Sequence, residues 1–241
     1  NFQFFNGSLD DVRVYNRALS AAEVKQVYQA EGLAKIAPAQ LLSTPIINKE
    51  GLIGWWTFEK QTVRGTSVWD RSVSGYTGTI TGSVTAIAGK IAQGLLFDGS
   101  TGFIALPSLG TVNAPFTISA WVKPLGIGNY GTIIGLRDGF IDSLAYYTNG
   151  NIIFGNFNAA YAGWTTSQLL NGLWHNLVVV ADSSTSATLY YDGVNMGRKT
   201  GLATVGGAWT GTPKIGRSAG ATSDYFKGSM DDVRIYNRAL S

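Results

Sequence analysis

Residues Phe226–Ser241 read FKGSMDDVRIYNRALS, and this segment occurs almost unchanged near the start of the chain as Phe5–Ser20, FNGSLDDVRVYNRALS. Thirteen of the 16 aligned positions are identical. In both copies apolar residues alternate with charged or polar ones, which is typical of a β-strand that buries one face. Two of the three differences exchange apolar side chains of similar volume, as a packed core tolerates. We therefore predict the same buried-face strand in each copy.

The two copies lie 221 residues apart, which is too long for a solenoid repeat and fits a whole domain with its linker. After the first copy, Ser20 and Glu23 stand at the spacing of a capping box and open a short helical pattern. Residues 33–50 contain two prolines and no clear periodicity, as in a linker. The predicted organisation is the closing strand and short helix of a preceding repeat in 1–32, a linker in 33–50 and one domain in 51–241.

The domain at 51–241 reads as a series of short strands joined by tight turns. Its glycine-rich composition, with 31 glycines in the chain, and Asp-Gly or Asn-Gly pairs between apolar runs favour an all-β, two-sheet antiparallel sandwich. The predicted strands are Leu52–Phe58, Gly78–Thr81, Gly94–Phe97, Phe103–Leu106, Thr117–Lys123, Thr132–Leu136, Ser143–Thr148, Ile152–Phe157, Trp174–Asp182, Thr188–Tyr191, Lys214–Gly216 and Met230–Tyr236.

Six motifs, kept in order, carry a family resemblance. They are GLIGWWTF at 51–58, GLLFDG at 94–99, FTISAWVKP at 116–124, LWHNL at 173–177, LYYDG at 189–193 and GSMDDVRIYNRAL at 228–240. Together they make the chain resemble the laminin G-like, concanavalin A-like jelly-roll family of large secreted and surface proteins. The resemblance implies two sheets packed face to face, and an extracellular or cell-surface location.

The resemblance also implies a structural calcium ion, because relatives often hold one through loop carboxylates and backbone carbonyls. The acids at motif positions, and so the candidate metal ligands, are Asp98, Asp231, Asp70 and Glu59. Relatives often carry a further acid where this chain has Gly102-Phe103. The same carboxylates can instead accept hydrogen bonds from backbone amides in turns. Both interpretations stay open at the level of the sequence.

The usual hydrolytic sites are missing. The four glutamates stand at 23, 31, 50 and 59, and none lies two residues from another acid, so the Glu-x-Asp-x-Glu strand of sandwich glucanases is absent. His175 is the only histidine, and without a Gly-x-Ser-x-Gly elbow we expect it to be a packing residue. Asp138 and Asp142 flank a glycine and are expected in a solvated turn. The sequence therefore predicts a protein without enzymatic activity.

A sugar-binding sandwich needs exposed aromatic side chains with polar neighbours. Tyr161, Trp164 and Trp209 lie outside the clearest strand patterns and have polar residues nearby, so they are the candidate ligand-binding residues. Packing within loops is the alternative reading of the same side chains. The tryptophans expected in the core, because they belong to the strand motifs, are Trp55, Trp56, Trp121 and Trp174.

The composition of the chain limits the classes of partner that it can bind. The net charge of +3 comes from scattered Lys and Arg, with no cluster beyond Arg198-Lys199, so no nucleic-acid footprint is indicated. No apolar run approaches the roughly 20 residues of a membrane helix, and there are no cysteines. Two functions remain: an adhesive module that binds a glycan or a surface protein, and a filament subunit whose extra strand pairs with a neighbouring copy.

Overall fold

A computed structural model of the chain describes residues 49–126, 130–138, 141–166, 168–220 and 223–240. The chain divides into two units, Asn1–Ile47 and Asn48–Ser241, and every described element belongs to the second. The predicted helix after Ser20 and the first copy of the duplicated strand lie outside the described residues.

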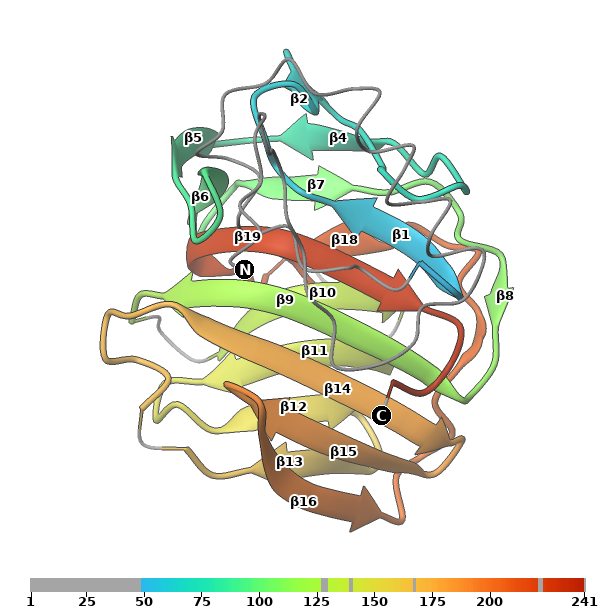
Figure 1. Ribbon diagram of the computed structural model, residues 1–241. Helices are drawn as coiled ribbons and strands as arrows, with labels where there is room; N and C mark the ends of the chain where they lie inside the picture. Colours follow the sequence, from blue (N-terminus) through green and yellow to red (C-terminus); the bar gives the residue numbers. More distant parts are fainter. Residues whose placement is uncertain (1–48, 127–129, 139–140, 167, 221–222, 241) are drawn as a thin grey trace, which may run out of the picture. The chain divides into compact units, whose positions relative to one another are not determined.

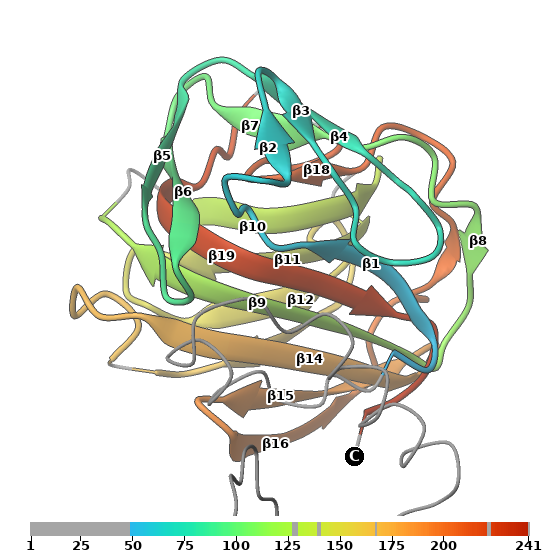
Figure 2. The same cartoon turned by 45° about the horizontal axis from the view of Figure 1, so that its top comes forward.

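The second unit is a sandwich of two antiparallel sheets, seen in Figures 1 and 2. In sheet A the strand order is β16 (Val194–Thr200), β15 (Ser186–Tyr191), β14 (His175–Ser183), β9 (Phe116–Pro124), β19 (Lys227–Tyr236), β6 (Gln93–Asp98) and β5 (Val84–Ala88), and β1 (Leu52–Trp56) also pairs with β19. In sheet B the order is β13 (Tyr161–Trp164), β12 (Ile152–Gly155), β11 (Ile141–Tyr147), β10 (Tyr130–Arg137), β18 (Lys214–Ile215), β7 (Phe103–Ala105), β4 (Gly78–Thr81), β3 (Ser67–Val68) and β2 (Val63–Arg64). Strands β8 (Thr111–Val112) and β17 (Gly207–Ala208) form a short separate ladder. The predicted all-β sandwich is confirmed.

Strand β19, the second copy of the duplicated segment, lies inside sheet A. It pairs with β9 along one side and with β6 and β1 along the other. As the alternation predicts, Val233 and Ile235 point into the core and have no exposed surface. Gly228, at φ 136°, is required by close packing, because a Cβ there would lie 2.5 Å from the carbonyl oxygen of Lys123. The segment is therefore an interior strand, not an edge.

The core between the sheets is aromatic and aliphatic. Phe97 and Phe226 meet edge to face with ring centroids 5.9 Å apart, and Phe116 meets Trp209 in the same way at 5.1 Å. Each of these side chains is almost fully buried. Truncating one buried phenylalanine to alanine typically costs about 3–5 kcal/mol, so these contacts contribute much of the stability that holds the two sheets together.

The strands that the sequence did not predict are short or exposed. Each of the twelve predicted strands coincides with an observed one, whereas β2, β3, β5, β8, β13, β16 and β17 were missed. Strand β16 is exposed along nearly its whole length, and β5 has no buried position. Such edge strands bury too little to need an apolar alternation, so the periodicity that reveals a strand is absent from them.

Candidate functional site

An open depression of about 440 Å³ lies on the outer face of sheet A. Its lining residues are Lys90, Trp121, Trp174, Asn176, Asp192 and Gly193. In β9 Ala120 and Val122 are buried in the core, so the half-buried Trp121 between them points outward. In β14 Leu177 is buried, so the half-buried Asn176 before it points outward as well. The depression thus joins aromatic surface, an amide and two opposite charges.

Strand register places these side chains together. Trp121 on β9 lies opposite Asn176 on β14. The turn between β15 and β16 has φ 50° at Asp192 and φ 79° at Gly193, which is the backbone that an Asp-Gly hairpin turn favours. That turn brings the Asp192 carboxylate to the start of β14, where Oδ1 accepts the backbone N–H of Asn176 at 2.7 Å. Lys90 reaches in from the turn between β5 and β6.

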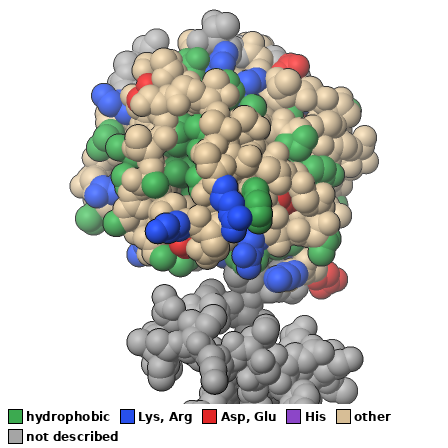
Figure 3. Space-filling model, turned by 90° about the horizontal axis from the view of Figure 1, so that it is seen from above, with side chains coloured by type: hydrophobic (Ala, Val, Ile, Leu, Met, Phe, Trp, Pro, Cys, Tyr) green, Lys and Arg blue, Asp and Glu red, His purple; other side chains and the backbone are tan. Residues whose placement is uncertain are grey.

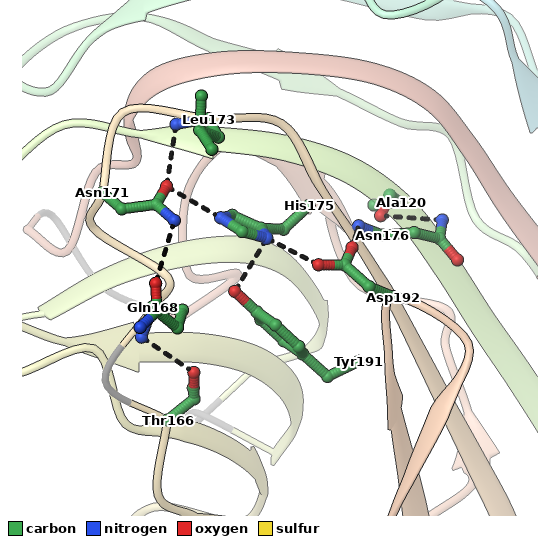
Figure 4. Close-up of polar contacts among 9 residues, drawn as sticks. All are labelled: Ala120, Thr166, Gln168, Asn171, Leu173, His175, Asn176, Tyr191 and Asp192. Atoms are coloured by element: carbon green, nitrogen blue, oxygen red, sulfur yellow. Dashed lines mark hydrogen bonds and ion pairs between the residues drawn. The ribbon is translucent and has the colours of Figure 1, made fainter.

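His175 lies between Asn171 and Asp192 and contacts both, as Figure 4 shows. The His175 side chain is only 7% exposed; its Nδ1 lies 2.7 Å from Asp192 Oδ2 and its Nε2 lies 3.0 Å from Asn171 Oδ1. Asn171 Oδ1 also accepts the backbone N–H of Leu173 at 2.9 Å, next to Trp174. Tyr191 stacks on the imidazole with ring centroids 4.9 Å apart. One histidine therefore ties together the two segments that present Asp192 and Trp174.

Cationic side chains stand over several aromatic rings of the sandwich. Figure 3, which views the molecule from above, shows Lys and Arg interspersed with hydrophobic and neutral side chains, several of them close together near the lower margin. Lys90 Nζ lies 4.6 Å from the ring centroid of Trp121, and the Arg64 guanidinium lies 4.7 Å from that of Trp69. Exposed contacts of this kind are worth only about 0.5–1 kcal/mol, so a ligand can displace Lys90 from Trp121.

The depression lacks the groups of a glycosidase. Such enzymes need two carboxyl groups on either side of the scissile bond. Among the described residues that line the depression, Asp192 is the only acid, and it is engaged by His175 and by the Asn176 amide. The lining therefore combines two indole rings with one amide, one carboxylate and one ammonium group.

Two of the three predicted ligand-binding aromatic residues are buried. Trp209 has no exposed surface and Trp164 is 3% exposed. Their indole N–H groups donate to Asp142 Oδ2 and to the carbonyl of Gly197, each at 2.8 Å. Their burial contradicts exposure to a ligand and agrees with the alternative interpretation, packing, because Trp164 ends β13 and Trp209 packs into the core beside β17. Tyr161, at the start of β13, is 43% exposed, as predicted.

Trp121 and Trp174, which were expected in the core, line the depression instead. The signal for Trp121 was present in the alternation of β9, where it is in phase with the polar Ser119 and Lys123 rather than with Ile118 and Ala120. Because alternate residues of a strand point to opposite faces, that phase places Trp121 outside. Of the four tryptophans expected in the core, Trp56 alone is fully buried.

Asp142 corrects a second expectation. It does not lie in a solvated turn with Asp138: it belongs to β11 and is fully buried, whereas Asp138 is exposed. Its two carboxylate oxygens accept the backbone N–H of Gly206 at 2.9 Å and the indole N–H of Trp209 at 2.8 Å. Asp142 is therefore a structural anchor of the core.

Two of the four predicted metal ligands have carboxylates already occupied by hydrogen bonds from backbone amides. Asp98 Oδ1 accepts the backbone N–H groups of Ser100, Thr101 and Gly102 at 2.8–3.0 Å. Although desolvation opposes it, this hydrogen bonding holds the pKa of Asp98 below its ordinary value. Asp70 accepts three backbone N–H groups at 2.8 Å in the same manner, those of Trp55, Ser72 and Tyr76. Asp98 therefore caps its own turn, whereas Asp70 joins the loop that follows it to strand β1.

Asp231 and Glu59 are in a different environment. Asp231 is fully buried; Oδ2 accepts the backbone N–H of Ile91 at 2.8 Å, and Oδ1 has no hydrogen-bond partner. Desolvation, helped by the neighbouring carboxylates of Asp232 and Glu59, raises the pKa of Asp231 to about 7. Desolvation raises the pKa of Glu59 as well, and the charge of Asp232 adds to that effect. A cation near Asp231 would relieve this repulsion.

The four predicted metal ligands do not converge. In the part of the chain that the structure describes, no three His, Asp or Glu side chains are close enough to hold one metal ion. The unpartnered oxygen of Asp231 is a suitable ligand for a hard cation. The remaining ligands would have to be backbone carbonyls or water. Calcium binding therefore stays a prediction, and Asp231 with Glu59 is the pair on which it can be tested.

A family model confirms the resemblance that the motifs carried. The laminin G-like model described as "Concanavalin A-like lectin/glucanases superfamily" matches residues 98–241. The chain belongs to this family. The matched range includes every lining residue of the depression except Lys90, so the laminin G-like fold itself presents most of the candidate site. No curated protein matches the chain.

Solved structures share the laminin G-like fold at low identity. The binding domain of Paraclostridial Mosquitocidal Protein 1 aligns with TM-score 0.62 and 14% identity, over 80% of this chain and 50% of that one. Domain 4 of AbnA, a GH43 extracellular arabinanase from Geobacillus stearothermophilus in complex with arabinotriose, aligns with TM-score 0.58 and 20% identity, over 79% and 94%. The binding domain of botulinum neurotoxin serotype D/C gives 0.60 and 14%, over 80% and 50%. This chain spans half the length of the toxin domains, and at these identities the likeness establishes the fold alone.

Proposed function

We propose that this laminin G-like domain is a non-catalytic carbohydrate-binding module whose ligand site is the depression on sheet A. The observation that carries the proposal is the presence of two half-buried tryptophans, Trp121 and Trp174, beside Asn176 and Asp192 in one open depression. The fold neighbours support it, because one was solved with arabinotriose and another, a botulinum neurotoxin binding domain, "in complex with SialylT".

The chemistry of the depression matches that of a sugar. A pyranose or furanose presents an apolar C–H face, which packs on an indole ring, and a rim of hydroxyl groups. Asn176, Asp192 and Lys90 supply donors and acceptors for those hydroxyls. Because the site is open and few ligand atoms are buried, we expect a Kd on the order of 0.1–1 mM for an oligosaccharide. An extracellular or surface location is part of the same proposal. No described segment is a helix of the length and hydropathy needed to cross a membrane.

The test is a binding experiment with a matched tryptophan control. Isothermal titration or affinity electrophoresis with a panel of neutral and sialylated oligosaccharides identifies the retained glycans. Trp121→Ala and Trp174→Ala should each weaken binding about tenfold or more, a loss of about 1.4 kcal/mol. Trp69→Ala removes a tryptophan that is 44% exposed but lies outside the depression, and it should bind as the unmodified protein does.

Two outcomes would contradict the proposal. One is a panel in which no glycan is retained at tens of millimolar by a protein that unfolds cooperatively. The other is a Trp121→Ala, Trp174→Ala double variant that binds its glycan with undiminished affinity, which would place the site elsewhere on the domain.

Self-association into a filament is a second proposed function, and one observation favours it. Strand β16 forms one edge of sheet A, and its Val194 is 63% exposed. A free edge can accept a strand from another copy. Light scattering across a wide concentration range tests this: growth of the mass with concentration supports a filament, and a constant monomer mass excludes it.

A further inference from the structure

Four aromatic side chains gather on the outer face of sheet B. They are Tyr130 on β10, Tyr147 on β11, Phe157 in the turn after β12, and Tyr161 on β13. Tyr130 meets Tyr147 edge to face with ring centroids 5.8 Å apart and meets Phe157 at 6.2 Å. Phe157 in turn meets Tyr161 at 5.8 Å. The Tyr147 and Tyr161 hydroxyl oxygens, 3.5 Å apart, complete the cluster. We call this set the tyrosine surface.

Register explains why the tyrosine surface faces outward. Tyr130 and Tyr147 are directly opposite each other in the β10–β11 pair. The preceding residue, Tyr146, is fully buried and packs edge to face on Phe226 in the core. Because neighbouring residues of a strand point to opposite faces, Tyr147 must lie on the outside, and Tyr161 is 43% exposed beside it.

The tyrosine surface is built for polar and apolar contact at once. The hydrogen bond with Tyr161 raises the pKa of Tyr147 to about 12, so the Tyr147 hydroxyl remains protonated near neutral pH and can donate as well as accept. The edge-to-face packing holds the rings in place before any ligand arrives, which reduces the entropy lost on binding. Tyrosines held in this way offer large, rigid, amphipathic contact area, and that combination suits the C–H faces and hydroxyls of a sugar.

We propose that the tyrosine surface is a second saccharide-binding site, so that one domain holds two glycan chains on opposite faces. The inference rests on the proposed function for the class of ligand. In Figure 1 sheet A faces the viewer and β10–β13 lie behind it, so the depression and the tyrosine surface are separated by the whole sandwich. Packed sheets lie about 10 Å apart between backbones, and each site points away from the other. A short oligosaccharide reaches one site only, whereas a polysaccharide can be cross-linked by the two.

Cross-linking gives the domain a property that neither site has alone. When two weak sites engage one polymer network, the second contact forms at a high effective concentration, and avidity exceeds either single affinity. The protein then gathers glycan chains instead of only attaching to one. This is the behaviour expected of a module that works on a polysaccharide matrix or on a dense glycan surface.

Amide chemical-shift mapping on the full chain tests the two sites separately. The probes are arabinotriose, cellotriose and 3′-sialyllactose, each titrated to tens of millimolar. The expected result is two independent groups of shifting resonances, one around Trp121 and Trp174 and one around Tyr147 and Tyr161. The Trp121→Ala, Trp174→Ala variant should lose about tenfold or more in affinity at the depression and change less than about twofold at the tyrosine surface.

The reciprocal variant, Tyr147→Ala with Tyr161→Ala, should lose the second group and retain the first. The variant Tyr147→Phe with Tyr161→Phe keeps the rings and removes the hydroxyls. If this variant unfolds cooperatively and still loses binding, its loss of binding is not caused by a loss of fold. With a polymer of whichever sugar binds, the unmodified protein should produce turbidity, and either alanine double variant should abolish it.

The outcomes separate this inference from the proposed function. Shifts confined to the depression would overturn the second site and leave the proposed function standing. Shifts confined to the tyrosine surface would overturn the depression as a ligand site and leave the tyrosine surface as the saccharide-binding site. If none of the three probes moves any resonance, both proposals fail together.

Discussion

The indole N–H of Trp209 donates a hydrogen bond to Asp142 Oδ2 at 2.8 Å, and neither residue has any exposed surface. The Arg137 Nε lies 3.5 Å from the same oxygen. Desolvation raises the pKa of Asp142, while the hydrogen bonds from Trp209 and Gly206 and the charge of Arg137 oppose that rise. Trp209, which was expected to contact a sugar, is thus held in the core by a hydrogen bond to Asp142, which was expected in a solvated turn.

Replacing Asp142 by alanine should therefore destabilise the fold by about 3 kcal/mol, because the indole and amide donors of Trp209 and Gly206 would be left buried without acceptors. Urea unfolding followed by tryptophan fluorescence measures the change. Asp138→Ala is the matched control, since Asp138 is exposed, and it should fall within about 0.5 kcal/mol of the unmodified protein. Equal stabilities of the two variants would contradict the anchoring role.

The pKa of Asp231 predicts how stability changes with pH. Its folded value of about 7 lies above the ordinary value of 3.8, so the folded state binds this proton more tightly than the unfolded state does. The associated stability is complete below about pH 4 and is lost as the pH rises through about 7, by an amount on the order of 4 kcal/mol.

Asp231→Asn should remove this dependence and leave the protein more stable than the unmodified form at pH 8. Urea midpoints measured from pH 4 to 8 for both proteins check it. Asp98→Asn should have the opposite effect and lower the stability at pH 8. The folded pKa of Asp98 is lowered, so the charged carboxylate stabilises the fold and this stabilisation disappears only in acid. If the Asp231→Asn profile ran parallel to that of the unmodified protein, the buried carboxylate would not be the cause.

Calcium, if it binds, should act on the same carboxylate. A cation beside the unpartnered Oδ1 of Asp231 would stabilise its charged form, so excess Ca²⁺ should raise the melting temperature at pH 8 and chelator should lower it. Asp231→Asn and Glu59→Gln should each diminish that response, whereas Asp70→Asn, which alters a carboxylate already occupied by backbone amides, should keep it. A melting temperature indifferent to both calcium and chelator would end the calcium hypothesis.

His175 should affect ligand binding without touching the ligand. Changing His175 to Phe removes the hydrogen bonds to Asp192 and Asn171 that hold both sides of the depression. We expect glycan affinity to fall several-fold at the depression and to stay unchanged at the tyrosine surface. Tyr191→Phe, which removes one hydroxyl near His175 Nδ1 and keeps the stacked ring, is the milder control. Chemical-shift titrations of both variants make the comparison; equal losses at the two sites would point to general unfolding.

Strand-by-strand comparison shows what local pattern can predict. The alternation in Met230–Tyr236 correctly placed Val233 and Ile235 in the core, and the Asp192-Gly193 pair correctly marked a hairpin turn. Both signals are local, since a strand exposes alternate residues to opposite faces and an Asp-Gly pair adopts positive φ at low cost. The same logic applied to β9 would have placed Trp121 outside.

The site itself lay beyond such patterns, because its parts are distant in sequence. Lys90, Trp121 and Asp192 come from three separate segments that only the strand order of sheet A brings together. Alternation also predicts which face of the sheet a side chain points to, but not whether that side chain is buried. Asp231 points to the outer face opposite Trp121, yet it is buried because the turn before β6 lies over it.

Periodicity and turn chemistry are local properties of neighbouring residues, so they were enough to predict an all-β sandwich in which Phe226–Ser241 supplies a buried strand. The resemblance to the laminin G-like family came separately, from six sequence motifs kept in order. Only the tertiary structure decided which aromatic side chains are presented to a ligand. Exposure depends on what lies across the strand and above it, so Trp209 is buried against Asp142 while Trp121 and Tyr161 remain open.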